Sequence, residues 1–361
     1  MNSNEIYVLY GNQPVKMAKE ILEAVKLADS IPKDAKIGIK PNLVVAKTPD
    51  SGATTHTELI EGVVQYLKEH GFDRIILLEG SWVGDSTQRA FKVCGYDRLT
   101  KEYGVPLFDT KHDTFVKRSY GGIDMEVCSK ALEVDFLINM PVLKGHCQTS
   151  ITCALKNMKG CITDREKRHF HSLGLHRPIA YLNKIRCADF VLVDGLCGDL
   201  DFEEGGNPVQ MNRVIAGTDS VLIDSYAANL MGYTIDEIPY IGIAAKEGVG
   251  SCDLDNAEII ELNHDESKTT IQPTRRVKQL AGYAAPKDAC SACYGNLIYA
   301  LNRLEEKGCL YDLNGKIAIG QGYKGVQADG IGIGNCTLGF THCVKGCPPK
   351  AVDIVNFLSK L

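Results

Sequence analysis

Short apolar segments alternate with longer segments of helical periodicity along most of the chain, and this alternation constrains the fold more than any other feature. The expected strands cover residues 5–11, 35–40, 74–80, 135–140, 189–195, 212–220 and 257–262. The expected helices cover 15–28, 56–71, 86–95 and 220–232, with a helix-like stretch at 150–158. Such alternation is typical of a parallel sheet flanked by helices. We therefore expect an α/β fold with a mostly parallel sheet and helices on both faces.

Polar residues follow the ends of most of these strands. In open α/β sheets, ligands bind in the crevice at the carboxyl ends of the strands. Strand-to-helix turns are also rich in polar capping residues, so capping is the alternative at any single position. Their recurrence favours a shared ligand site, built from Lys40, Asn42, Glu79, Lys144, His146, Asp194, Thr218 and Asp219.

Residues 141–171 are rich in basic side chains and follow an expected buried strand. Lys144, Lys156 and Arg168 would bind phosphate or carboxylate groups, and His146 or His169 would move a proton. The alternative is a solvated basic surface. The density of charge favours an anionic-ligand site, in which we expect Lys144, His146 and His169 to be catalytic. Metal binding by His169 and His171 is disfavoured, because positions i and i+2 do not share a helix face.

A charged stretch at 264–276 separates this part from a cysteine-rich part, so we expect an α/β domain at 1–275 and a small α/β module at 276–361. The N-terminus lacks the features of a secretory signal, which predicts a cytoplasmic location and reduced thiols. Clustered cysteines then favour metal over disulfides. The C-terminal cysteines form a C-x2-C pair followed by three more, the last before two prolines: Cys290, Cys293, Cys336, Cys343 and Cys347.

These cysteines suit an iron–sulfur cluster, since a [4Fe-4S] cubane takes four thiolates. Zinc is the alternative metal, because four cysteines also bind it tetrahedrally. Zinc sites more often use two closely spaced pairs, and the Cys-Pro-Pro ending favours iron–sulfur.

The motifs of this module resemble the cluster site of the small subunit of nickel–iron hydrogenases and of its complex I relative. There a C-x2-C pair, a later Gly-x-Cys and a final Gly-Cys-Pro-Pro supply the ligands. The resemblance is confined to these motifs. It implies that the ligands here are Cys290, Cys293, Cys336 and Cys347. Cys343 is left over, either as a substitute ligand or as a bystander.

The larger part of the chain resembles the family catalogued as domain of unknown function 362. The resemblance covers roughly residues 5–250 and implies a fold and an iron–sulfur module, but no reaction. The motifs that carry it are Lys40-Pro41-Asn42, Leu143 to His146, Ala154 to Asn157, and Ala216 to Asp219 followed by Asp224.

The net charge of −5, without a long Lys/Arg block, argues against a nucleic-acid partner. No apolar run reaches the ~18 residues of a membrane span. Three functions stay open: an iron–sulfur oxidoreductase acting on an anionic small molecule, a hydro-lyase or isomerase with the cluster as Lewis acid, and an electron carrier or scaffold without substrate. We favour the first, with a redox partner such as a ferredoxin, and with a flavin or another anionic cofactor as a further possibility.

Overall fold

The computed structural model describes residues 1–264, 269–272, 274–310 and 315–360. The charged stretch at 264–276 lies partly outside these residues. The chain divides into two compact units. The first comprises 1–145, 150–167 and 176–273, and the second comprises 146–149, 168–175 and 274–361.

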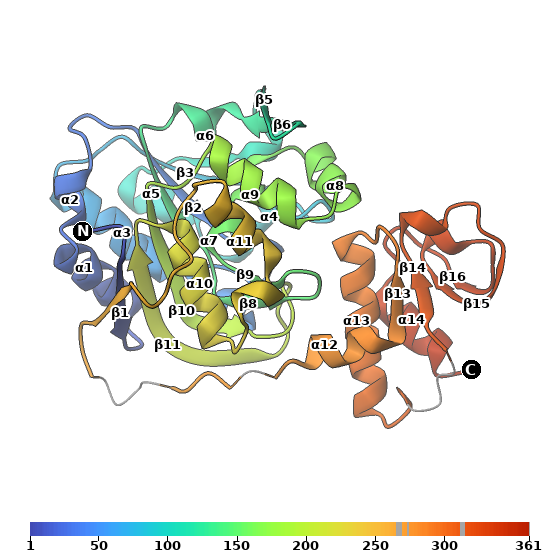
Figure 1. Cartoon of the computed structure of the whole chain (residues 1–361). Coiled ribbons are helices and arrows are strands. Elements are labelled where there is room, and N and C mark those ends of the chain that lie inside the picture. The colour runs from blue at the N-terminus through green and yellow to red at the C-terminus, as the bar shows by residue number, and fades with distance from the viewer. Residues whose placement is uncertain (265–268, 273, 311–314, 361) are drawn as a thin grey trace. The chain divides into compact units, whose positions relative to one another are not determined.

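The first unit is built on an eight-stranded sheet (Figure 1). All neighbouring strands are parallel except β1–β11 and β11–β10, so the expected mostly parallel sheet is confirmed. In spatial order the strands are β12 (Glu258–Glu261), β1 (Glu5–Tyr10), β11 (Pro208–Gly217), β10 (Phe190–Asp199), β7 (Phe136–Met140), β2 (Ile37–Pro41), β3 (Ile75–Glu79) and β4 (Leu107–Asp109).

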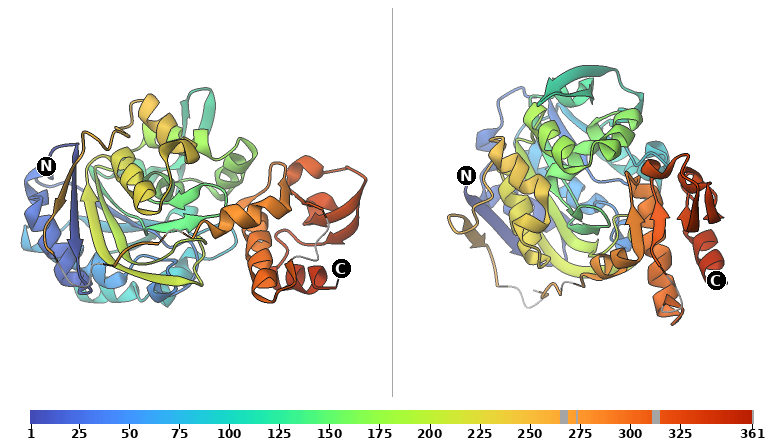
Figure 2. Two further views of the ribbon diagram at one scale, coloured as in Figure 1. Left: turned by 60° about the horizontal axis from the view of Figure 1, so that its bottom comes forward. Right: turned by 45° about the vertical axis from the view of Figure 1, so that its right-hand side comes forward.

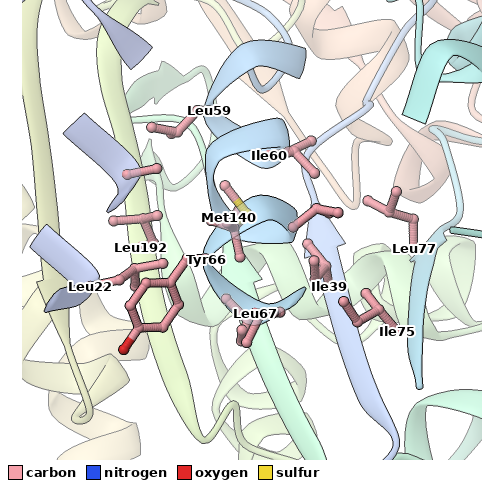
Figure 3. Packing of buried hydrophobic residues seen from close by; sticks show 14 of the residues in the cluster. Leu22, Ile39, Leu59, Ile60, Tyr66, Leu67, Ile75, Leu77, Met140 and Leu192 are labelled. Carbon is pink, nitrogen blue, oxygen red and sulfur yellow. The ribbon is translucent and has the colours of Figure 1, made fainter. Parts of the chain in front are cut away.

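The main core lies between the sheet and the helices α1 (Pro14–Ala24) and α3 (Thr57–Glu69). Successive side chains of a strand point to opposite faces, and alternate apolar residues of the central strands enter this core. Figure 3 shows Ile39, Leu77, Met140 and Leu192 packed there with Leu59 and Leu67 of α3. The residues that alternate with these along each strand therefore face the other side of the sheet.

That other side carries a second set of helices, of which α7 (Ala154–Asn157) contacts β7 and α10 (Ser220–Leu230) contacts β10. The helix-like stretch at 150–158 is more broken than expected. It begins as β9 (Ser150–Thr152), which pairs with β8 (Lys144–His146), and only then becomes α7. Further helices of this unit are α2 (Leu27–Ser30), α4 (Thr87–Val93), α5 (Asp97–Tyr103), α6 (Ser129–Glu133), α9 (His176–Ile185) and α11 (Pro239–Lys246), with a hairpin of β5 (Phe115–Tyr120) and β6 (Ile123–Cys128). Helix α8 (Asp164–Ser172) has residues 164–167 in the first unit and 168–172 in the second.

The second unit has a four-stranded, wholly parallel sheet, drawn in orange to red in Figure 2. Its strands in spatial order are β13 (Ala284–Pro286), β14 (Ile317–Ile319), β15 (Ala328–Ile333) and β16 (Phe340–Val344). Its helices are α12 (Arg276–Leu280), α13 (Ser291–Glu306) and α14 (Ala351–Leu358). Within the described parts of both units, no helix is long and apolar enough to cross a membrane.

Candidate functional site

Lys40 and Asn139 point away from the α1/α3 core, are register partners on β2 and β7, and are fully buried. A buried ammonium group needs a counter-charge. Glu79, at the end of β3, supplies it through an ion pair of 2.6 Å between Lys40 Nζ and Glu79 Oε2. Gly160 passes directly over this pair, because a Cβ at position 160 would lie 2.1 Å from Glu79 Oε1. Lys40 and Glu79 are therefore enclosed and paired with each other.

Asn157 ties α7 to the strand ends beneath it. Its Nδ2 donates to Asn139 Oδ1 at 2.7 Å and to Pro41 O at 3.2 Å, and its Oδ1 accepts from Asn42 Nδ2 at 2.8 Å. All three asparagines are buried. The Lys-Pro-Asn and Ala-Leu-Lys-Asn segments, 115 residues apart in sequence, thus meet in one hydrogen-bonded network.

Lys144 belongs to the same network. Its Nζ donates to Asn42 Oδ1 at 2.9 Å, to Ala53 O at 2.5 Å and to Glu203 O at 2.8 Å. Burial lowers the pKa of Lys144 to about 7. Three acceptors match the three protons of an ammonium group, so Lys144 has no donor left for a ligand while these bonds hold.

Lys156 and Lys159 differ in their surroundings. Lys156 is buried and forms an ion pair with Glu203, supported by a bond of 3.1 Å to Thr152 Oγ1. Lys159, in the turn Met158–Cys161 (η3), is half-buried, and its ammonium group has no hydrogen-bond or ion-pair partner in the described part of the chain. Burial, reinforced by the ammonium groups of Lys156 and Lys167, lowers the pKa of Lys159 to about 7. Lys159 is thus available to an anion in a way that Lys156 is not.

Asp194 lies in the middle of β10, which runs four residues beyond the strand end expected at 195, and it is on the α1/α3 face of the sheet. It is fully buried, and its Oδ2 accepts from His56 N at 2.7 Å and lies 2.8 Å from His56 Nδ1. Burial opposes protonation of His56, but the Asp194 carboxylate outweighs it and the pKa of His56 is raised. A carboxylate at Nδ1 holds the ring in one orientation. Asp194 therefore positions a histidine that the sequence patterns did not single out.

Asp219 and Asp224 cap helices. Asp219 Oδ1 accepts from Val221 N at 2.8 Å and from Leu222 N at 3.0 Å, at the start of α10. Asp224, inside α10, accepts from Ala154 N at 2.6 Å and from Leu155 N at 3.2 Å, and so caps α7. Burial raises the pKa of Asp224 to about 7, against the opposing effect of these bonds.

His146, Arg168 and His169 belong to the second compact unit. His146 is buried, and its Nδ1 accepts from Gln148 N and Thr149 N, both at 3.0 Å. Because Nδ1 accepts, the ring proton of neutral His146 lies on Nε2. Arg168 and His169 are exposed on α8. The catalytic roles expected for Lys144, His146 and His169 stay predictions.

The cysteine-bearing segments all leave the same edge of the small sheet. Because its strands are parallel, their carboxyl ends meet at one edge. Cys290 and Cys293 follow β13, Cys336 follows β15, and Cys347 follows β16. Strand order thus brings together residues that lie up to 57 positions apart, because each loop departs from the same side.

Neighbouring thiols of the expected ligand set contribute to the raised pKa values of Cys290 and Cys293. Burial, and next the thiols of Cys290, Cys347 and Cys336, raise the pKa of Cys293 to about 12. Burial, followed by Cys336 and Cys347, raises the pKa of Cys290. Cys343 is placed differently, since its Sγ lies 3.6 Å from Thr337 Oγ1 and 3.7 Å from Gly334 O.

The surroundings of these thiols fit a metal-bound group, although no three His, Cys, Asp or Glu side chains of the described residues already stand at metal-ligand spacing. Cys290 is the N-cap of the 16-residue helix α13 and Cys293 lies in its first turn. The N-terminal end of a helix favours negative charge, which thiolate ligands would bring. Gly334, with φ of +93°, brings the backbone close, because a Cβ there would lie 3.9 Å from Cys293 Sγ. The donor set is therefore suited to a thiolate-bound cluster.

The fold is that of an α/β protein with a mostly parallel sheet in its first unit and a wholly parallel sheet in its second. The first unit carries the match to a known family: residues 37–229 fit the model of the family described as domain of unknown function (DUF362), and the chain belongs to it. A thylakoid-associated protein of Synechocystis sp. is 23% identical over 226 residues, which are 60% of this chain and 68% of that protein.

Solved structures resemble the chain only distantly. The lactate racemase apoprotein of Thermoanaerobacterium thermosaccharolyticum aligns with a TM-score of 0.40 and 14% identity over 64% of this chain. A Thermotoga maritima protein aligns with a TM-score of 0.40 and 15% identity over 65% of this chain. The chain spans 57% and 60% of these two proteins, respectively.

Proposed function

We propose that this protein is an iron–sulfur oxidoreductase that acts on an anionic small molecule. Cys290, Cys293, Cys336 and Cys347 would hold a [4Fe-4S] cluster, which when bound supplies one-electron transfer. The observation that carries the proposal is the departure of all four cysteines from one edge of a parallel sheet, with thiols that affect one another's pKa.

The chain's own residues have two tasks at this site. The four thiols must lose their protons when they bind iron, and the raised pKa values of Cys290 and Cys293 mean that the metal's charge has to drive this loss at these two residues. The helix N-terminus at Cys290 then offsets the negative charge of the bound thiolates. A full set of four thiolates favours electron transfer over the hydro-lyase alternative, which needs an iron with an open position.

The anionic molecule would bind in the first unit at Lys159. Lys40 and Lys156 are already paired with Glu79 and Glu203, while Lys159 lacks a partner among the described residues. The ammonium groups of Lys156 and Lys167 favour negative charge near Lys159, and the Glu203 carboxylate acts against them. Binding of an anion would return the pKa of Lys159 toward its ordinary value. A substrate carboxylate and the phosphate of a flavin or nucleotide would be held by the same interaction.

Metal analysis after anaerobic purification tests the cluster. Wild-type protein should be brown and contain iron and acid-labile sulfide in equal amounts. Cys336→Ala should lose most of both, whereas Cys343→Ala, the matched control, should keep them. A colourless wild-type protein with stoichiometric zinc, or equal iron in both variants, would contradict the proposed ligand set.

Analysis of co-purifying small molecules tests the anion site separately. Mass spectrometry of molecules released from wild-type protein should find an anionic species that is missing from Lys159→Met. Lys47→Met, which removes an exposed lysine of the same unit, should retain it. Unchanged iron content in both variants would show that the loss concerns the anion alone. Equal retention of the species by Lys159→Met would rule out this lysine.

A further inference from the structure

Gln321 contacts one of the four cysteines directly. Its amide Nε2 donates to Cys290 Sγ at an N–S distance of 3.6 Å. Its Oε1 accepts from Lys324 Nζ at 3.3 Å. An ammonium group can only donate, so Lys324 fixes which end of the amide is oxygen and turns the N–H group toward sulfur.

The backbone around Gln321 holds this contact in place. Gln321 N donates to Asp288 O at 3.1 Å, and Gly322 N donates to Lys287 O at 3.1 Å. Gly320 approaches the same segment so closely that a Cβ would lie 2.0 Å from Lys287 O, and its φ of +117° also requires glycine. The turn Gln321–Tyr323 (η7) is thus fastened to residues 287–288, immediately before Cys290.

The place of Gln321 in the small sheet matches that of the cysteines. It follows β14, the one strand of this sheet that is not followed by an expected ligand. The side chain is half-buried, so its hydrogen bond to sulfur is partly shielded from water. Lys324 also lowers the pKa of Cys290, against the larger effects of burial and of the neighbouring thiols. Both side chains therefore favour negative charge on the Cys290 sulfur.

We propose that Gln321, oriented by Lys324, is a positioning residue that raises the reduction potential of the cluster by hydrogen-bonding the Cys290 thiolate. This inference rests on the proposed function. Reduction adds one electron, and the added negative charge spreads onto the ligand sulfurs. A donor at a sulfur therefore stabilises the reduced form more than the oxidised form.

A potentiometric titration with dithionite as the electron donor, followed by the visible and EPR spectra, tests this role. Gln321→Leu should lower the midpoint potential with iron and sulfide content unchanged. Gln321→Glu, which keeps the shape and adds negative charge, should lower it further. Lys324→Met should produce a smaller shift in the same direction. Gln327→Leu, an exposed glutamine in the same connection, is the matched control and should leave the potential unchanged.

The possible outcomes separate this inference from the proposed function. Wild-type protein without iron would refute the proposed function before any potential is measured. An intact cluster with a wild-type potential in Gln321→Leu and Gln321→Glu would overturn the tuning role. Loss of iron from both variants, with iron retained in Gln327→Leu, would also overturn it, because Gln321 would then hold the loop and not set the potential.

Discussion

Lys144 and Lys159 show at the scale of single residues why charge density in a sequence does not locate a binding site. Both have a pKa lowered to about 7 by burial. Lys144 is surrounded by three acceptors, whereas Lys159 has none among the described residues. Partners decide which lysine is free to bind a ligand, and those of Lys144 come from positions up to 102 residues away.

Lys144→Met should change the pH dependence of stability. The unfolded chain keeps this lysine protonated up to its ordinary pKa of 10.5, while the folded chain releases the proton at about 7. Between these values the unfolded state binds more protons, so stability should rise with pH in wild-type protein. The unfolding free energy of the variant should rise less steeply with pH. At pH 7 it should be lower by about 1–3 kcal/mol, because the acceptors of Lys144 are left unpaired.

Urea unfolding at pH 7, 8 and 9 measures both effects. Identical slopes in wild-type protein and Lys144→Met would show that Lys144 stays protonated in the folded state.

Among the elements, α7 differs from its predicted form because its contacts come from distant parts of the sequence. The stretch 150–158 predicted one helix, but Ser150 takes a φ of +63° and starts a strand that pairs with β8. The four-residue helix that follows is capped by Asp224, 70 positions away. A cap this distant in sequence cannot be recognised from local patterns, whereas the buried strands β2, β7 and β10 could be predicted from their apolar runs.

Removal of this cap should destabilise the first unit. Asp224→Ala leaves the amides of Ala154 and Leu155 without an acceptor inside the protein, which should cost about 1–3 kcal/mol of unfolding free energy. Asp224→Asn keeps one acceptor oxygen and should cost less. Urea denaturation at a fixed pH of 7 compares the two, and equal stability of Asp224→Ala and wild-type protein would contradict the capping role.

The sequence predicted that functional residues lie at strand ends, but it did not show how these residues are arranged in the folded chain. The rule that ligands bind at carboxyl ends of parallel strands was applied to the large sheet, where Lys40, Glu79 and Asp194 are buried and paired within the protein. The proposed cysteine ligands follow the carboxyl ends of strands in the small sheet, whose strand order the cysteine spacing alone did not reveal. His56 and Gln321 escaped prediction because their partners lie 138 and 31 residues away and no motif marks them.

At the scale of the whole molecule, charge is unevenly distributed. Residues 274–361 hold eleven Lys and Arg against six Asp and Glu, although the entire chain holds 40 against 45. Lys345 and Lys350 flank Cys347 in sequence, and both are exposed. These lysines beside Cys347, a ligand in the proposed cluster site, would suit an acidic electron-carrier protein such as a ferredoxin.

Electron transfer from reduced ferredoxin should therefore slow as salt is added. In stopped-flow measurements at low ionic strength, Lys345→Glu with Lys350→Glu should lower the second-order rate constant about tenfold or more. Lys307→Glu is a control for charge reversal, because Lys307 follows the C-terminal end of α13, about 24 Å along the helix from Cys290. Equal rates in the Lys345→Glu, Lys350→Glu double variant and in Lys307→Glu would exclude this surface as the docking site. Rates that do not depend on salt would exclude it as well.

The EPR spectrum of anaerobically purified protein after dithionite reduction tests the central claim most directly. A cluster on Cys290, Cys293, Cys336 and Cys347 predicts a rhombic signal of a reduced [4Fe-4S] centre near one spin per chain, retained in Cys343→Ala and lost in Cys336→Ala. An EPR-silent protein that contains zinc in place of iron, or a signal that survives Cys336→Ala unchanged, would contradict the account.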